Sequence, residues 1–104
     1  MKKFNERCYQ ALKLIPKGKV TTYKEIARYL GSNGYRAVGN AMSKNPNAPQ
    51  VPCHRVVCSD GKIGGYAFGV KKKIDLLSKE KISVKNGKVE NLKTNFHVFK
   101  GREK

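Results

Sequence analysis

The 104-residue sequence contains no tryptophan, only three cysteines and only seven acidic residues. It has no apolar run long enough to span a bilayer and no secretory signal at its start. These absences argue against a membrane protein and indicate an intracellular one, in which thiols stay reduced. An odd number of cysteines also argues against a disulfide framework. The sequence shows no repeat, low-complexity segment or linker, which favours one small domain.

The scarcity of acidic residues leaves a large positive charge. Twenty-three Lys and Arg residues against seven Asp and Glu give a formal net charge of +16. Such an excess on so short a chain favours a polyanionic partner, most simply nucleic acid. The alternative is a lysine-rich surface that serves solubility or heat resistance. With 38% hydrophobic residues, the chain is expected to fold as a globule.

The spacing of apolar residues predicts a mostly helical fold. An amphipathic helix is expected over residues 3–15, with Cys8 on its apolar stripe. A second helix follows the capping box Thr22-x-x-Glu25 and stops at Gly31, and a third occupies residues 35–46. These two short helices, separated by a Gly-containing turn, form a helix-turn-helix pattern.

The second half of the chain carries weaker patterns. Residues 56–66 are expected to form a strand, an Asp-Gly turn and a short return, and residues 82–91 a hairpin. Residues 70–82 predict a further amphipathic helix, with Val70, Ile74, Leu77 and Lys81 in helical register. The stretch after Leu92 has little pattern and is expected to fray.

The helix predicted over 35–46 has an unusual outward face. It is small and polar with one long cation at its start, and consists of Arg36, Gly39, Asn40 and Ser43. Such a slim face suits close approach to a nucleic-acid backbone or to a narrow minor groove. The alternative is an ordinary solvated face with a glycine tolerated for packing. The opposite side suits the core and carries Val38, Ala41 and Met42.

The motif VPCHRVV, residues 51–57, carries the chemistry. Metal binding by Cys53, His54 and Cys58 is disfavoured, since zinc sites show paired C-x2-C or H-x3-H spacing. A buried inert thiol suits Cys58, whose neighbours are apolar, but not Cys53, which lies between proline and histidine. The third interpretation is a nucleophile: His54 can raise the thiolate fraction of Cys53, either after a turn behind Pro52 or through a water.

A carboxylate that holds the far nitrogen of His54 would complete such a relay. Of the seven carboxylates, Glu80 on the helix predicted over 70–82 is the candidate. The alternative is an exposed glutamate between Lys79 and Lys81.

Four sequence blocks point to a known family: TTYKEIA, RAVGNAMSKNP, PCHRVV and GGYAFGVKKKIDLLSKE. In this order and spacing they resemble the C-terminal domain of O6-alkylguanine-DNA alkyltransferases, over roughly residues 4–92. The resemblance implies a mostly α fold with short β-strands, a winged helix-turn-helix-like DNA-binding domain that carries the active-site cysteine loop. Residues 1–92 are then the DNA-binding and catalytic domain, and residues 93–104 a basic tail.

The resemblance also implies roles for individual residues. Cys53 matches the alkyl acceptor, His54 the base that acts through a water, and Glu80 the acid that orients His54. Tyr23 matches the tyrosine that donates to the extruded guanine, and Arg36 the finger that fills the space left by that base. The minor-groove helix face corresponds to Arg36, Ala37, Gly39, Asn40 and Ser43. Hinge and pocket positions correspond to Asn45, Val51, Tyr66, Ala67 and Phe68.

The implied reaction is repair of duplex DNA by direct reversal of damage. The protein, expected to be a monomer in the cytoplasm or nucleoid, flips O6-alkylguanine out of the helix. It then transfers the alkyl group, mainly methyl, irreversibly to Cys53, so that each molecule acts once. No cofactor and no metal are expected.

Two departures from the family pattern bear on this function. The chain begins where the C-terminal domain would, as in alkyltransferase-like proteins that bind lesions without transfer and flag them for another pathway. In those proteins tryptophan typically replaces the acceptor cysteine, and this sequence has no tryptophan. Phe68 stands where many relatives carry glycine, so a narrower pocket that prefers methyl over benzyl is expected. A generic basic DNA-binding domain remains a third hypothesis, but it leaves PCHR unexplained.

Overall fold

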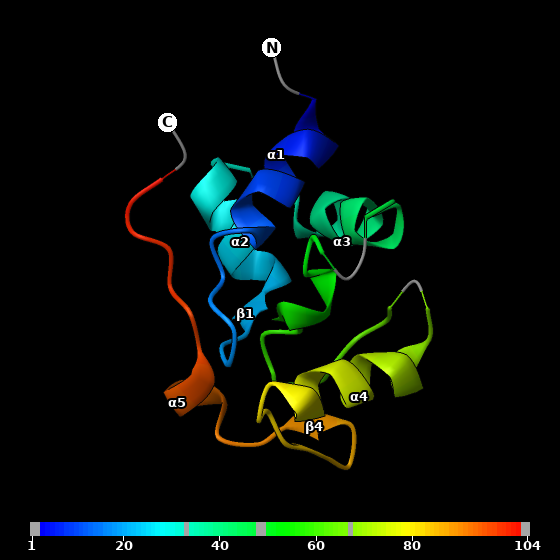
Figure 1. Ribbon diagram of the computed structural model, residues 1–104. Helices are drawn as coiled ribbons and strands as arrows, with labels where there is room; N and C mark the ends of the chain where they lie inside the picture. Colours follow the sequence, from blue (N-terminus) through cyan, green and yellow to red (C-terminus); the bar gives the residue numbers. More distant parts are fainter. Residues whose placement is uncertain (1–2, 33, 48–49, 67, 103–104) are drawn as a thin grey trace.

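The computed structural model describes residues 3–32, 34–47, 50–66 and 68–102, and its helices dominate (Figure 1). In chain order the elements are α1 (Phe4–Leu12), β1 (Thr21–Thr22), α2 (Tyr23–Leu30), α3 (Tyr35–Ser43), the 3-10 helix η1 (Cys53–Arg55), β2 (Val56–Val57), α4 (Val70–Lys79), β3 (Val84–Lys85), β4 (Lys88–Val89) and α5 (Leu92–Asn95). The first three helices gather at one end of the molecule, and α4 lies with the β3–β4 hairpin at the other. None of the helices in these ranges is long and apolar enough to cross a membrane.

Helices α2 and α3 form the predicted helix-turn-helix. The Thr22 hydroxyl accepts a hydrogen bond from the Glu25 backbone N–H at 3.0 Å and so caps the start of α2. Gly31 ends the helix in the left-handed conformation, with φ of +72°, which glycine adopts without steric cost. The prediction of a mostly helical, helix-turn-helix-like domain with short strands is therefore confirmed.

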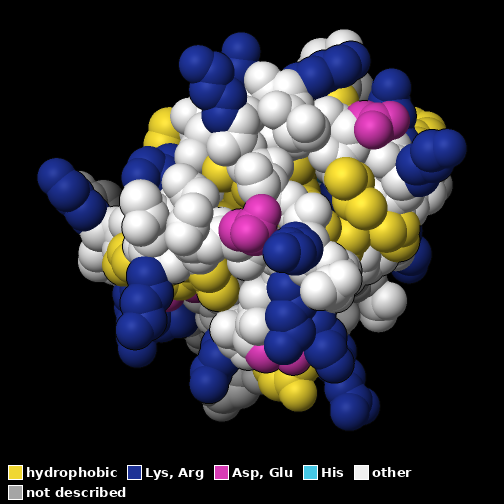
Figure 2. Space-filling view, turned by 90° about the horizontal axis from the view of Figure 1, so that it is seen from below, with side chains coloured by type: hydrophobic (Ala, Val, Ile, Leu, Met, Phe, Trp, Pro, Cys, Tyr) yellow, Lys and Arg dark blue, Asp and Glu magenta, His cyan; other side chains and the backbone are white. Residues whose placement is uncertain are grey.

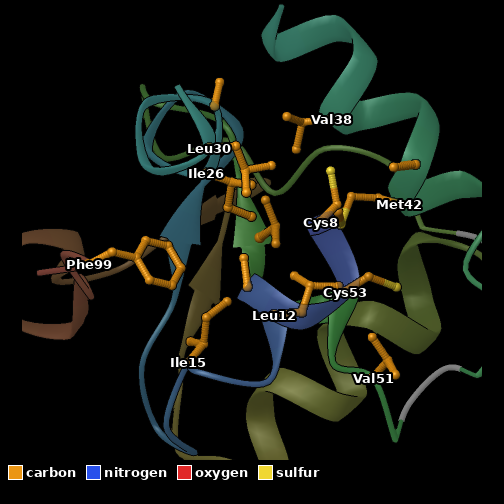
Figure 3. Close-up of a cluster of buried hydrophobic side chains, with 14 residues drawn as sticks. Cys8, Leu12, Ile15, Ile26, Leu30, Val38, Met42, Val51, Cys53 and Phe99 are labelled. Carbon is orange, nitrogen blue, oxygen red and sulfur yellow. The ribbon is translucent and has the colours of Figure 1, made fainter. Parts of the chain in front are cut away.

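The main core lies between α1, α2 and α3 and the cysteine loop (Figure 3). Cys8 is fully buried there, as its place on the apolar stripe predicts. Helix α1 ends three residues earlier than expected. Ile15 is nevertheless buried, because the next turn continues with hydrogen bonds from Leu14 and Ile15 to carbonyls three residues back.

The strands differ in part from the prediction. Residues 56–66 contain the predicted strand and a turn at Asp60 and Gly61, across which the Cys58 N–H donates to the Lys62 carbonyl at 2.8 Å. The strand β2, however, pairs in parallel with β1, Thr21 beside Val56. The return segment bridges Lys62 to Lys88 instead. Parallel pairing joins segments that lie far apart in the chain, so local sequence does not reveal it. The β3–β4 hairpin turns at Asn86 and Gly87, both at positive φ, as expected for this dipeptide.

The buried face of α4 also differs from the prediction. Val70 is 45% exposed, and Lys81 lies beyond the end of the helix. The residues of α4 that are buried are Leu77 and, unexpectedly, Lys73. The side of α4 that bears Leu77 therefore faces inward and carries Lys73, one turn earlier, into the interior with it.

The tail does not fray within the described residues, contrary to expectation. Residues 96–101, here called the C-terminal strap, run along β1 and α2. His97 donates its backbone N–H to the Val20 carbonyl at 2.7 Å. Phe99 is buried, and its ring stacks on Tyr29 with centroids 4.6 Å apart. The Phe99 backbone N–H donates to the carboxylate of Glu25, which also accepts a hydrogen bond from Arg28. Glu25 therefore binds the strap and Arg28 instead of the start of its own helix, as a capping box would require.

Candidate active site

A tight turn presents Cys53 at the base of a cavity. The turn behind Pro52, which sequence reasoning required for Cys53 and His54 to act together, is the 3-10 helix η1. Asn45, buried at the end of α3, donates its side-chain amide to the Val51 carbonyl at 2.7 Å. It thereby ties the helix-turn-helix to the cysteine loop, in the hinge position predicted for it.

His54 and Glu80 meet although 26 residues separate them. His54 Nε2 lies 3.1 Å from Glu80 Oε2, and both side chains are largely buried. Arg55 brackets the same carboxylate, with Nε 2.8 Å from Oε1 and Nη2 2.6 Å from Oε2. Glu80 is therefore no exposed glutamate between lysines. It is the centre of an ion-pair network.

The electrostatics fix which nitrogen of His54 can act as a base. Burial lowers the pKa of His54, outweighing the opposing effect of the hydrogen bond that the ring donates to Glu80, so the ring is neutral at pH 7. Burial pushes the pKa of Glu80 up, but the hydrogen bonds from Arg55 and His54 outweigh it and leave that pKa below its ordinary value. An ionised carboxylate only accepts, so Nε2 carries the proton. Nδ1 is then the basic nitrogen, and it is buried with no hydrogen-bond partner among the described residues.

Cys53 itself is held as a thiol in the resting protein. Burial raises its pKa, while a hydrogen bond from Asn45 and the positive charge of Lys73 act in the opposite direction. A base is therefore needed before the sulfur can attack, and Nδ1 of His54 is suited to that role.

The cavity beside Cys53 has a volume of about 290 Å³, near the lower end of ligand pockets (~300–1,000 Å³). Its lining comprises Tyr23, Gly39, Met42, Ser43, Cys53, Gly65 and Tyr66. Burial, with the nearby Cys58 and Cys53, raises the pKa of Tyr23 to about 12, so its hydroxyl stays a donor. The Tyr66 hydroxyl is a second buried polar group with no partner among the described residues. The cavity lining therefore combines the thiol of Cys53 and the thioether of Met42 with three hydroxyl-bearing residues, Tyr23, Ser43 and Tyr66.

Helix α3 forms one wall of this cavity and continues outward from it. Gly39 and Ser43 line the cavity, whereas Arg36, Ala37 and Asn40 are exposed. Since residues at i, i+3 and i+7 share a helix face, Arg36 lies beyond the cavity on the same side. The predicted outward face and the cavity are thus continuous.

The remaining predicted pocket residues are placed less uniformly. Phe68 is 61% exposed and packs its ring edge-on against Tyr66, 5.7 Å between centroids. Val51 is buried in the core behind Cys53, while Ala67 lies outside the described residues. Cys58 is only partly buried, less than an inert core thiol would be.

Sequence reasoning missed two functional candidates, Arg55 and Lys73. Arg55 stands next to His54 in the motif, but its ion pair depends on Glu80, 25 residues away. Lys73 occupies a place on the apolar stripe of α4, four residues before Leu77, and that spacing was the available signal.

Two other arrangements do not compete with this site. A larger cavity of about 530 Å³ lies between α2 and α5 and contains neither cysteine nor histidine in its lining. No group of three or more His, Cys, Asp or Glu side chains within the described ranges could hold a metal ion. Of these arrangements, the cavity beside Cys53 is the one that combines a thiol in its lining with an adjacent histidine–carboxylate pair.

Fold and site together define a helix-turn-helix-like domain in which a buried thiol, Cys53, lies next in the chain to a histidine that is bonded to Glu80. Residues 3–82 match the model of the family described as "6-O-methylguanine DNA methyltransferase, DNA binding domain". The chain belongs to this family.

Relatives and solved structures agree with this assignment. A methylated-DNA–protein-cysteine methyltransferase of Candida glabrata is 47% identical over 83 residues, 79% of this chain and 40% of that protein. The Mycobacterium tuberculosis OGT in complex with DNA superposes with a TM-score of 0.75 and 44% identity, over 78% of this chain and 50% of that one. The S. pombe Atl1, solved with damaged DNA containing O6-carboxymethylguanine, gives a TM-score of 0.80 and 34% identity, over 93% and 98%. The chain spans about half, or less, of the length of the curated relatives it matches.

Proposed function

We propose that this protein repairs duplex DNA by transferring an alkyl group, mainly methyl, from O6 of guanine to Cys53. The observation that carries the proposal is that Cys53 lines a cavity of small-ligand size while His54, its neighbour in the chain, is bonded to Glu80. Relatives named methylated-DNA–protein-cysteine methyltransferase support the same reaction. The compartment we expect is the cytoplasm or nucleoid.

The chemistry balances without a cofactor. His54 Nδ1 takes the thiol proton of Cys53 through a water, while Glu80 and Arg55 hold the ring in place. The Cys53 sulfur then attacks the alkyl carbon in line, the S–C bond forms, and the C–O6 bond breaks with its electrons passing to the base. The hydroxyl of Tyr23 stabilises the negative charge that develops on the departing guanine. Guanine finally takes up the proton that His54 removed from Cys53. Because the thioether is stable, each molecule reacts once.

The base must leave the stack before its O6 substituent can reach Cys53. The exposed face of α3 suits the minor groove, since Gly39 adds no side chain to it. Arg36 would occupy the gap left by the flipped nucleotide. The formal charge of +16 provides the general attraction to phosphates, and Figure 2 shows many Lys and Arg side chains projecting around one face, with few acidic ones. Added salt should therefore weaken binding.

The second candidate is a non-enzymatic protein that binds O6-alkylguanine and flags it for another pathway. The similarity to S. pombe Atl1, which extends over 98% of that chain, favours it. The intact relay behind Cys53 favours transfer, because a binding-only site needs neither a basic Nδ1 nor a carboxylate to orient it.

The decisive experiment is mass spectrometry of the protein after incubation with duplex DNA that contains O6-methylguanine. Transfer predicts one added methyl on the Cys53 peptide and no turnover beyond stoichiometry. Cys53→Ser should bind the duplex and stay unmodified, whereas Arg36→Ala should slow transfer by impairing base flipping. If the wild-type protein bound the O6-methylguanine duplex selectively but stayed unmodified, transfer would be rejected and the flagging function would be supported.

The range of alkyl groups is a separate expectation. The Phe68 ring, braced by Tyr66, would narrow the approach to Cys53. We therefore expect methyl to be transferred far faster than benzyl, and Phe68→Gly to reduce the difference. Comparable rates for both groups in the wild-type protein would contradict this.

A further inference from the structure

Helix α4 buries a lysine directly behind the candidate active site. The Lys73 side chain is fully buried, and its ammonium group donates to three backbone carbonyls. Val56 O lies at 2.7 Å, Gly65 O at 3.1 Å, and Ile63 O is the third acceptor. The same Nζ lies 5.9 Å from the ring centroid of Tyr23, within the range of a cation–π contact.

This burial is costly and needs a reason. An ammonium group removed from water loses its hydration, and neutral carbonyls replace only part of it. None of the ion pairs among the described residues involves Lys73. Burial accordingly lowers the pKa of Lys73 to about 8, while the charges of Cys53 and Cys58 raise it.

The three carbonyls belong to the segments that build the cavity. Val56 follows η1 and so continues the turn that presents Cys53. Ile63 and Gly65 flank Gly64, and Gly65 lines the cavity together with Cys53. At Gly64 a Cβ would come within 3.0 Å of the Tyr23 hydroxyl, so this segment and Tyr23 are already in close contact. Lys73 is the common partner of both segments.

We propose that Lys73 is a positioning residue for the transfer reaction: its ammonium group joins the two segments that build the cavity under Tyr23 and supplies the buried positive charge that stabilises the Cys53 thiolate. The inference rests on the proposed function for its catalytic consequence, but the thiolate effect is independent of DNA. The titratable groups that interact with Lys73 are Cys53, Cys58, His54 and Tyr23. The pH dependence of Cys53 must therefore be read against the other three groups and against Lys73 itself.

The test compares Lys73→Met, which keeps the length of the side chain but removes its charge, with Lys72→Met. Lys72 is the exposed neighbour on the same helix and serves as the matched control. Two rates are measured for each: alkylation of Cys53 by iodoacetamide across pH, resolved by peptide mass spectrometry, and methyl transfer from an O6-methylguanine duplex. For Lys73→Met we expect the midpoint of Cys53 alkylation to rise by about one pH unit and transfer at pH 7 to slow about tenfold. Lys72→Met should change neither.

The outcomes separate this inference from the proposed function. A midpoint and a transfer rate that both equal those of the wild-type protein would overturn the role of Lys73. A shifted midpoint in a protein whose wild-type form transfers no methyl would support the role of Lys73 and reject the proposed reaction.

A second measurement covers the case in which Lys73→Met does not fold. The ammonium group of Lys73 is titrated by NMR in the wild-type protein and in Cys53→Ser. We expect the pKa of Lys73 to fall when the sulfur is removed, because ionisation of Cys53 raises that pKa in the wild-type protein. An unchanged pKa would overturn the proposed coupling.

Discussion

The substitution Gly39→Ala distinguishes two roles for this glycine, close packing within the protein and close approach to DNA. The first role predicts that the variant is less stable than the wild-type protein, and the second that it is more stable but binds DNA more weakly. Gly39 lies in the middle of α3, and a Cβ added there would meet no atom within 4 Å. Gly39→Ala should therefore stabilise the protein by about 0.8–1.0 kcal/mol through helix propensity alone. For a domain of this size that corresponds to an increase in Tm of about 4–8 °C.

The same methyl group would project from the face that we assign to the minor groove. A methyl inserted into a close-packed contact costs about 1–3 kcal/mol, so the Kd for an O6-methylguanine duplex should rise about 5- to 150-fold. Fluorescence anisotropy in a Cys53→Ser background measures this without transfer. Gln10→Ala, on the exposed side of α1, is the control and should leave Kd unchanged. Higher stability with an unchanged Kd would refute the close approach of DNA to α3, and lower stability would mean that Gly39 serves packing.

Three further perturbations test the buried networks. Glu80→Gln leaves Arg55 largely buried without its counter-charge, so the free energy of unfolding should drop by up to about 3–5 kcal/mol and transfer should slow; urea denaturation unchanged from wild type would contradict the network. Phe99→Ala should cost about 3–5 kcal/mol by emptying its place against Tyr29, and a loss below ~1 kcal/mol would mean that the strap is not part of the core. Stability should also fall as pH decreases from 7. The folded-state pKa of His54 lies below its ordinary ~6.5, so the unfolded chain binds more protons and stability is lost as pH falls through that range. Glu80, whose folded-state pKa is also depressed, adds a second loss as pH falls below ~4.3 and on through its folded-state pKa; urea midpoints that stay constant from pH 7 to 3 would contradict both assignments.

The sequence predicts the helical half of this fold well, because its contacts are local. Helix α2 begins at Thr22 and ends at Gly31, and these residue types favour the start and the end of a helix whatever the rest of the fold. The apolar spacing in α1 and α3 identifies the core positions Cys8 and Val38 directly. Glu80 could be selected only because the chain has so few carboxylates to choose from.

The features that sequence reasoning missed depend on pairings across long separations. The β1–β2 pair is parallel, and the strap is held by single groups such as Phe99 and Arg28 rather than by a repeated pattern. Lys73 was missed because a hydropathy pattern treats every lysine as solvated. Its burial depends on three carbonyls that only the folded chain brings together.

Acidic residues are scarce in this protein, and two of the seven serve internal structure. Glu25 holds Arg28 and the strap against α2, and Glu80 holds His54 and Arg55 behind the cysteine loop. Neither carboxylate is then free to neutralise the basic surface. Four other acidic residues are exposed, Glu6, Asp60, Asp75 and Glu90, but the 23 Lys and Arg residues far outnumber them. The reaction that we propose depends on both features, because a cationic exterior attracts the phosphates of DNA and the carboxylate of Glu80 keeps the His54 ring in the orientation that the base needs.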